Sequence, residues 1–195
     1  MDDIFYGGVI YIDLRGYTRI VEKKVLGNIA SLIYHYQQDI TNKVYELFDD
    51  EVAAIEYMGD GVCIILKNKN KNNTFVSTLY RNTLQLKDTV YSTIESKKQE
   101  LTGLNDLDFG IGISTSRIYQ KSILSPGQTI HRKMFFGTSL NRAAKIGDSM
   151  NNKKNYIGID KMMYDEFLEN SLGGYYFVKA KKPIVHMYER NELNN

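Results

Sequence analysis

Two hydrophobic stretches, 53–58 and 62–66, flank a Gly59-Asp60-Gly61 break in the first half of the chain. Both stretches are apolar and rich in residues that favour strands, so the polar break between them predicts a hairpin turn. Residues 8–13 repeat the pattern, because an apolar run ends there in Asp13. Each of these two aspartates is therefore expected at the end of a strand in a buried sheet.

Longer segments carry apolar residues at intervals of three and four, the period of a helix with one buried face. We expect helices at four segments: 26–48, 74–100, 138–150 and 160–169. We expect further strands at four others: 107–114, 156–159, 175–178 and 185–189. The segment 119–133 is expected to form an arm or extended hairpin around Pro126-Gly127. This order of elements is typical of an α+β sandwich, with helices over a mainly antiparallel sheet.

Composition narrows this picture. A length of 195 residues and a hydrophobic content of 43% suit one domain with a sizeable core, and we expect residues 1–195 to form a single domain. The 25 basic and 23 acidic side chains nearly cancel, which gives no argument for binding to nucleic acid or to a membrane surface. The single cysteine, Cys63, excludes a disulfide framework and a cysteine zinc site.

The N-terminus shows no basic region followed by a long apolar run, so no secretory signal is expected. No stretch approaches the roughly 20 apolar residues that a membrane span requires. We therefore expect a cytoplasmic protein that neither inserts into a membrane nor binds nucleic acid.

Asp13 and Asp60 are the first candidates for chemistry. Carboxylates at the ends of neighbouring strands can meet, and such a pair supplies the oxygen ligands that Mg²⁺ or Mn²⁺ takes beside a phosphate. An Asp-Gly turn alone is common and in most cases binds nothing. The pair gains weight from the longer segments around each aspartate.

Four separated segments resemble the signature blocks of one family. They are VIYIDLRGYTRIVE at 9–22, EYMGDG at 56–61, FGIGIST at 109–115 and FGTSLNRAAKI at 136–146. Together, and in this order, they resemble the class III nucleotidyl cyclases, which are the adenylate and guanylate cyclases with a ferredoxin-like catalytic domain. Each block is a weak signal alone, whereas the four together are specific and span essentially the whole chain. The resemblance implies a ferredoxin-like α+β fold.

The resemblance also implies roles for individual residues. Asp13 and Asp60 match the two aspartates that hold two divalent metal ions, Mn²⁺ or Mg²⁺. Asn141 matches the asparagine that orients the ribose, and Lys145 stands where the family usually has an arginine that stabilises the transition state. In this family each site forms between two head-to-tail protomers. The resemblance therefore implies a homodimer with two shared active sites.

Lys179 and Lys145 both stand at positions that carry basic residues in the family. Lys179 matches the lysine that contacts the triphosphate, although Lys181 could serve in its place. Lys145 departs from the family pattern, because a lysine is a compact point charge and cannot make the planar two-pronged contact of an arginine. This departure leaves open a slower reaction, a changed geometry or an inactive site.

Glu56 and Met134 stand at the two positions that read the base in this family. Adenylate cyclases pair a lysine with an aspartate or threonine there, and guanylate cyclases pair a glutamate with a cysteine. Glu56 points to guanine, whose ring N–H and exocyclic amine can both donate to one carboxylate. Met134 fits neither pair, because a thioether is at best a weak acceptor.

Tyr57 stands where many family members have a threonine. A phenol that took up room needed by a purine would resemble the small pyrimidine cyclases of bacterial antiviral defence, which make cyclic UMP or cyclic CMP. If Glu56 faces the base it favours uracil over cytosine, since uracil N3 carries a hydrogen that a carboxylate accepts. Strand alternation sends Glu56 and Tyr57 to opposite faces. Tyr57 therefore either reaches the base through a twist or bulge, or points into the core.

The leading hypothesis is a metal-dependent cyclase that converts a pyrimidine nucleoside triphosphate, UTP first, to its 3′,5′-cyclic monophosphate and pyrophosphate. The product would signal to a separate cyclic-nucleotide-binding effector, in antiviral defence. A guanylate or adenylate cyclase is the alternative within the same chemistry. A catalytically silent nucleotide-binding module is the alternative of another class, motivated by Lys145 and Met134. The retained pair of Asp13 and Asp60 argues against silence.

Overall fold

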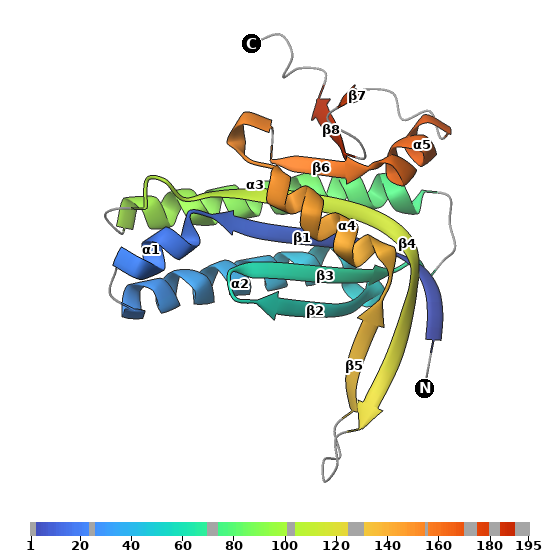
Figure 1. Cartoon of the computed structure of the whole chain (residues 1–195), viewed down its shortest axis with the longest axis horizontal. Coiled ribbons are helices and arrows are strands. Elements are labelled where there is room, and N and C mark those ends of the chain that lie inside the picture. The colour runs from blue at the N-terminus through green and yellow to red at the C-terminus, as the bar shows by residue number, and fades with distance from the viewer. Residues whose placement is uncertain are drawn as a thin grey trace.

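The computed structural model describes residues 3–23, 26–69, 74–100, 104–124, 131–154, 156–169, 175–179 and 184–189. Within these residues one curved sheet carries helices on both faces (Figure 1). Its strands are β1 (Asp3–Arg15), β2 (Val52–Met58), β3 (Gly61–Lys67), β4 (Asp108–Leu124), β5 (His131–Phe136), β6 (Ile157–Asp160), β7 (Tyr175–Lys179) and β8 (Ile184–Glu189).

The strands follow the order β2-β3-β1-β4-β6-β8-β7, and β5 pairs with β4 outside this path. Strand β1 lies at the centre, antiparallel to β3 on one side and to β4 on the other. The pair of β4 and β6 is parallel, and the other pairs are antiparallel. The predicted α+β class with a mainly antiparallel sheet is therefore confirmed.

The helices are α1 (Tyr17–Lys23), α2 (Leu26–Phe48), α3 (Phe75–Glu100), α4 (Thr138–Ser149) and α5 (Lys161–Glu169), with short 3₁₀ turns η1 (Asp49–Glu51) and η2 (Asn152–Lys154). Helices α2 and α3 lie side by side behind the sheet, while α4 crosses its other face over β1 and β4 (Figure 1). No helix in the described ranges is long and apolar enough to cross a membrane.

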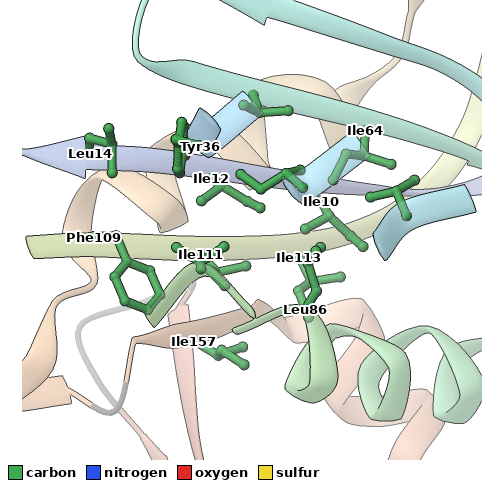
Figure 2. Packing of buried hydrophobic residues seen from close by; sticks show 14 of the residues in the cluster. Ile10, Ile12, Leu14, Tyr36, Ile64, Leu86, Phe109, Ile111, Ile113 and Ile157 are labelled. Carbon is green, nitrogen blue, oxygen red and sulfur yellow. The ribbon is translucent and has the colours of Figure 1, made fainter. Parts of the chain in front are cut away.

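The larger core lies between the sheet and the paired helices α2 and α3. Alternate residues of β1, such as Ile10 and Ile12, point into it beside Ile111 and Ile113 of β4 (Figure 2). Because side chains alternate along a strand, the residues between them face α4. Asp13 follows Ile12 and therefore belongs to the α4 face of the sheet.

A smaller core of Phe5, Val9, Cys63, Ile65, Ile118 and Ala143 fills the space under α4. The helix lies so close to the sheet that a Cβ atom on Gly112 would come within 2.0 Å of the Ala143 carbonyl oxygen. Glycines in β4 thus permit close packing of α4 and fix the position of the residues that α4 carries.

Several boundaries differ from the expected ones. Strand β1 starts at Asp3 because its first residues pair with the outer part of β4. Helix α1 was not expected, since its seven residues are too few to show a helical period. Strand β4 extends to Leu124 and pairs with β5, which confirms a hairpin at the predicted arm. The Pro126-Gly127 tip lies outside the described residues.

Candidate functional site

The turn between β2 and β3 holds Asp60 at one end of the sheet. Met58 pairs with Gly61, so the connection consists of Gly59 and Asp60 alone. Gly59 has a φ of 67°, in the left-handed region that glycine adopts without strain. The Gln37 side-chain amide on α2 donates to the Gly59 carbonyl at 2.9 Å. The turn is therefore tied to a long helix, which limits the positions that Asp60 can take.

Asp13 lies beside Asp60 because β1 and β3 are neighbours. Ile12 pairs with Val62, which places Asp13 one residue beyond this pair and next to the turn. Both carboxylates line a polar cleft of about 560 Å³, together with residues 14–19 and Glu22. The structure thus brings the two predicted metal ligands into one cleft.

Both carboxyl groups have a raised pKa. At Asp13 burial is the main cause, and the charges of Asp60 and Asp148 add to it while the Arg15 guanidinium opposes it. At Asp60 burial again raises the pKa, and a backbone hydrogen bond and Arg15 oppose it. Partly buried carboxylates that repel each other favour a bound cation, because a cation relieves the cost of holding both charges.

Arg15 reaches from β1 across the cleft to α4. Its Nη1 lies 3.6 Å from an Asp13 carboxylate oxygen and 3.0 Å from one of Asp148. Its Nη2 donates to the Gly147 carbonyl at 2.7 Å. One protein cation therefore already offsets part of the negative charge of the cleft.

The residues of the cleft fit a divalent cation held together with a phosphate. The hydroxyl of Tyr36, a fully buried residue of α2, has no hydrogen-bond partner among the described residues. Burial raises the pKa of this phenol well above its usual value, and the charges of Asp13 and Asp60 add to the effect. The described residues contain no group of three or more ligating side chains. Two carboxylates suit Mg²⁺ or Mn²⁺, which keep water and substrate phosphates as their other ligands.

A second pocket, of about 530 Å³, lies between the β2–β3 hairpin and β5. Glu56 and Met134 both line it, so the structure brings these two predicted residues together. Glu56 pairs with Cys63 across the hairpin and shares its face of the sheet. Arg132 and Lys133 also line this pocket and are candidate hydrogen-bond donors. The pocket therefore combines apolar walls with one acidic and two basic side chains.

Tyr57 points its hydroxyl away from Glu56. The residue pairs with Val62, whose side chain belongs to the larger core, and the Tyr57 hydroxyl shares a hydrogen bond with Thr41 on α2. Tyr57 is 46% exposed and is also among the residues that line the second pocket. The position of the hydroxyl follows strand alternation and gives no support to a phenol that narrows the pocket.

Asn141 and Lys145 lie four residues apart on the exposed face of α4. Neither lines the cleft of Asp13 and Asp60, and neither lines the second pocket. Within one chain the predicted catalytic residues therefore do not line the cleft that holds the predicted metal ligands. Lys179 is the last residue of β7, and its side chain lies outside the described residues.

Three residues of interest were missed by sequence reasoning. Arg15 follows Asp13 by two positions in a strand, and strand alternation could have placed both on one face. Arg132 stands in the same relation to Met134 on β5. Tyr36 falls in the apolar stripe of α2 and reads as core, because the sequence does not show that its hydroxyl lacks a partner.

A model of one known protein family matches nearly the whole chain. The model of the adenylate and guanylate cyclase catalytic domain family matches residues 6–187. A search among curated protein sequences finds no match.

Solved structures give the same result for the fold. The guanylyl cyclase Cya2 is 17% identical with a TM-score of 0.72, over 96% of this chain and 92% of that chain. The adenylyl cyclase CyaB from P. aeruginosa is 14% identical with a TM-score of 0.73, over 97% and 95%. The guanylate cyclase domain of RhGC from Catenaria anguillulae, in complex with GTP, is 12% identical with a TM-score of 0.68, over 95% and 96%. At these identities the likeness shows a shared fold.

Proposed function

Because this chain belongs to the family of adenylate and guanylate cyclase catalytic domains, we propose that it converts a pyrimidine nucleoside triphosphate, UTP first, to the 3′,5′-cyclic monophosphate and pyrophosphate. One observation carries the catalytic part of the proposal: Asp13 and Asp60 line a single cleft at the ends of neighbouring strands. The product serves as a second messenger for a separate cyclic-nucleotide-binding effector, in antiviral defence.

The reaction requires the ribose 3′-oxygen to attack the α-phosphate while pyrophosphate leaves. Divalent cations, when bound, lower the pKa of the attacking hydroxyl and neutralise the triphosphate. Asp13 and Asp60 hold these cations in the proposed site. Their partial burial raises their pKa and disfavours two bare charges, which supports this role.

The protein otherwise positions groups and supplies positive charge. Asn141 orients the ribose, Lys145 offsets charge that develops on the phosphates, and Lys179 contacts the triphosphate. Asn141 and Lys145 are exposed on α4 and do not line the cleft that Asp13 lines. Their separation supports a homodimer in which a second copy of the chain supplies both residues to each site.

The second pocket is proposed to bind the base. Glu56 accepts the N3–H of uracil, whereas cytosine presents a bare acceptor at N3 and is repelled there. Met134 is larger than the cysteine of guanylate cyclases and cannot donate to a base oxygen, which supports a smaller base. Arg132 lines the same pocket and can donate to a uracil carbonyl. The preference for UTP rests on Glu56 and Met134, because the Tyr57 hydroxyl is bound to Thr41.

GTP is the second candidate substrate, favoured by the same pocket. Guanine presents two N–H donors to Glu56 and a carbonyl that Arg132 can contact. Adenine fits less well, because its N1 is an acceptor and would face a carboxylate.

The test is incubation of the protein with UTP, CTP, GTP and ATP separately, with Mn²⁺ or Mg²⁺, and identification of the products by mass spectrometry. Cyclic UMP is expected as the main product. A clear preference for GTP would overturn the pyrimidine assignment and leave the cyclase intact. Absence of any cyclic product, with nucleotide binding retained in calorimetry, would favour a silent binding module.

A further inference from the structure

Arg15 connects Asp13, which the proposed function assigns to cation binding, with helix α4, which carries Lys145. Its Nη1 lies between Asp13 of β1 and Asp148 of α4, and it is closer to Asp148, at 3.0 Å against 3.6 Å. Its Nη2 is bound to the Gly147 carbonyl at 2.7 Å. Its Nε is buried, and no partner for it occurs in the described part of the chain. The guanidinium is therefore attached mainly to α4 and retains capacity for another acceptor.

Asp148 is also a neighbour of Lys145 on the same helix. Residues three apart on a helix lie on one face, and both of these are exposed. Within the described residues Asp148 is ion-paired with Arg15, and no ion pair joins it to Lys145. Arg15 thus occupies the carboxylate that would otherwise attract the Lys145 ammonium.

We propose that Arg15 is a positioning residue that couples cation binding at Asp13 to the availability of the Lys145 charge on α4. The inference rests on the proposed function, in which Asp13 binds a divalent cation and Lys145 acts on the substrate. A cation at Asp13 competes with the guanidinium for the carboxylate and repels it, so Arg15 pairs more fully with Asp148. Lys145 is then left free to act on phosphate.

The same bridge links the two sites of the proposed homodimer. In a shared-site dimer, Asp13 of one chain serves one site and Lys145 of that chain serves the other. Filling one cation site would therefore favour the active arrangement at the second site through a single arginine.

Mn²⁺ affinity tests the bridge without reference to turnover. Arg15→Gln is expected to bind Mn²⁺ several-fold more tightly in calorimetry, because a competing cation is removed from Asp13. Asp148→Asn is expected to bind it several-fold more weakly, because Arg15 then pairs with Asp13 alone. In the double variant, the effect of Asp148→Asn is expected to shrink to the direct effect of losing one nearby negative charge, since Arg15 is no longer there to be redirected.

Asp106→Asn is the matched control. The Asp106 side chain is 76% exposed, as is that of Asp148, and it pairs at 3.6 Å with Arg19, another arginine of the cleft. Its loss measures the general effect of removing one nearby negative charge. Mn²⁺ binding by Asp148→Asn should be weaker than by Asp106→Asn, and this comparison remains valid if Arg15→Gln does not fold.

Turnover of the nucleotide provides a second test of the role of Arg15. Arg15→Gln is expected to lower kcat more than it changes KM, because Asp148 captures Lys145, and adding Asp148→Asn should restore part of kcat. Equal Mn²⁺ affinity with and without Arg15, or an Asp148→Asn effect that is equally large in the Arg15→Gln background, would overturn the inference about Arg15 alone. Failure of the unaltered protein to bind Mn²⁺ and to form any cyclic nucleotide would overturn the proposed function, and this inference with it.

Discussion

Asp60 lies in a tight turn, is partly buried and has the carboxylate of Asp13 nearby. Its pKa is higher in the folded chain than the ordinary value of 3.8, with burial as the main cause. The folded state therefore binds the proton of the Asp60 carboxyl more tightly than the unfolded state does. Without a metal, the stability that this proton contributes is lost as the pH rises through the raised pKa. The side chain costs stability at neutral pH, which is expected of a residue kept for binding.

Asp60→Asn is expected to abolish cyclic nucleotide formation and to leave the metal-free protein at least as stable at neutral pH. The amide keeps the shape of the side chain but removes a charge that burial disfavours and that cations need. Product formation and thermal unfolding, measured on the same sample, check both parts. Full activity in this variant would contradict the assignment of Asp60 as a metal ligand.

Tyr36 provides a stability test beneath the same cleft. A buried hydroxyl without a partner is costly, so Tyr36→Phe is expected to raise the free energy of unfolding of the metal-free protein by about 1 kcal/mol. Tyr80 is the matched control, because it is equally buried in the same core and its hydroxyl is not among the buried polar atoms that lack a hydrogen-bond partner. Tyr80→Phe should give no gain in denaturant unfolding. A loss of stability in Tyr36→Phe would show that the hydroxyl is satisfied.

Glu56→Gln is expected to lower kcat/KM for UTP roughly tenfold to a hundredfold, the range for one hydrogen bond to a charged group of about 1.5–3 kcal/mol. The amide keeps an acceptor but loses the charge that faces N3–H. Relative turnover of UTP and CTP by both proteins is the measurement. If selectivity is unchanged, Glu56 does not contact the base.

The opposite faces of Glu56 and Tyr57 could be predicted from strand alternation, because successive side chains in a strand point to opposite sides. The partner of the Tyr57 hydroxyl could not, since Thr41 lies on another element and their contact depends on how α2 packs. Steric reasoning from a single position therefore favoured a role that the packing of α2 does not support.

At the scale of elements, long helices were predicted best. The observed bounds of α2 equal the predicted ones, and those of α3 and α4 differ by one residue, because many turns repeat the apolar period. The ends of β1 and β4 were set by their pairing with each other and with β5, which no local pattern records. The bounds of these two strands therefore depend on contacts between distant segments.

The close packing of α4 against β4 gives a prediction for the whole helix. Gly112→Ala would place a Cβ 2.0 Å from the Ala143 carbonyl oxygen, and both atoms belong to rigid elements. We expect a loss of about 3 kcal/mol in unfolding free energy and reduced activity, because α4 carries the proposed catalytic residues. Gly27→Ala in α2 is the control, since nothing lies within 4 Å of its Cβ. It should stabilise by about 0.5–1 kcal/mol.

At the scale of the whole molecule, the sequence predicted a set of candidate site residues, and the structure shows which of them lie together within one chain. Two local patterns, a strand end and a tight turn, were enough to place Asp13 beside Asp60. The position of Asn141 relative to them depends on the direction of α4 across the sheet, which no spacing along the chain determines. Within one chain Asn141 does not line the cleft of Asp13 and Asp60, and the proposed homodimer would bring these residues together.

Mixing two inactive variants tests the proposed homodimer. Asp13→Ala and Asn141→Ala each damage both sites of their own homodimer. A hybrid dimer collects both defects in one site and leaves the other site intact, because the two residues of one chain serve different sites. Random exchange should therefore restore about a quarter of the unaltered activity. A mixture of Asp13→Ala and Asp60→Ala should restore nothing, since both residues belong to the same half of a site. Exchange of labelled subunits without recovery in the first mixture would contradict shared sites.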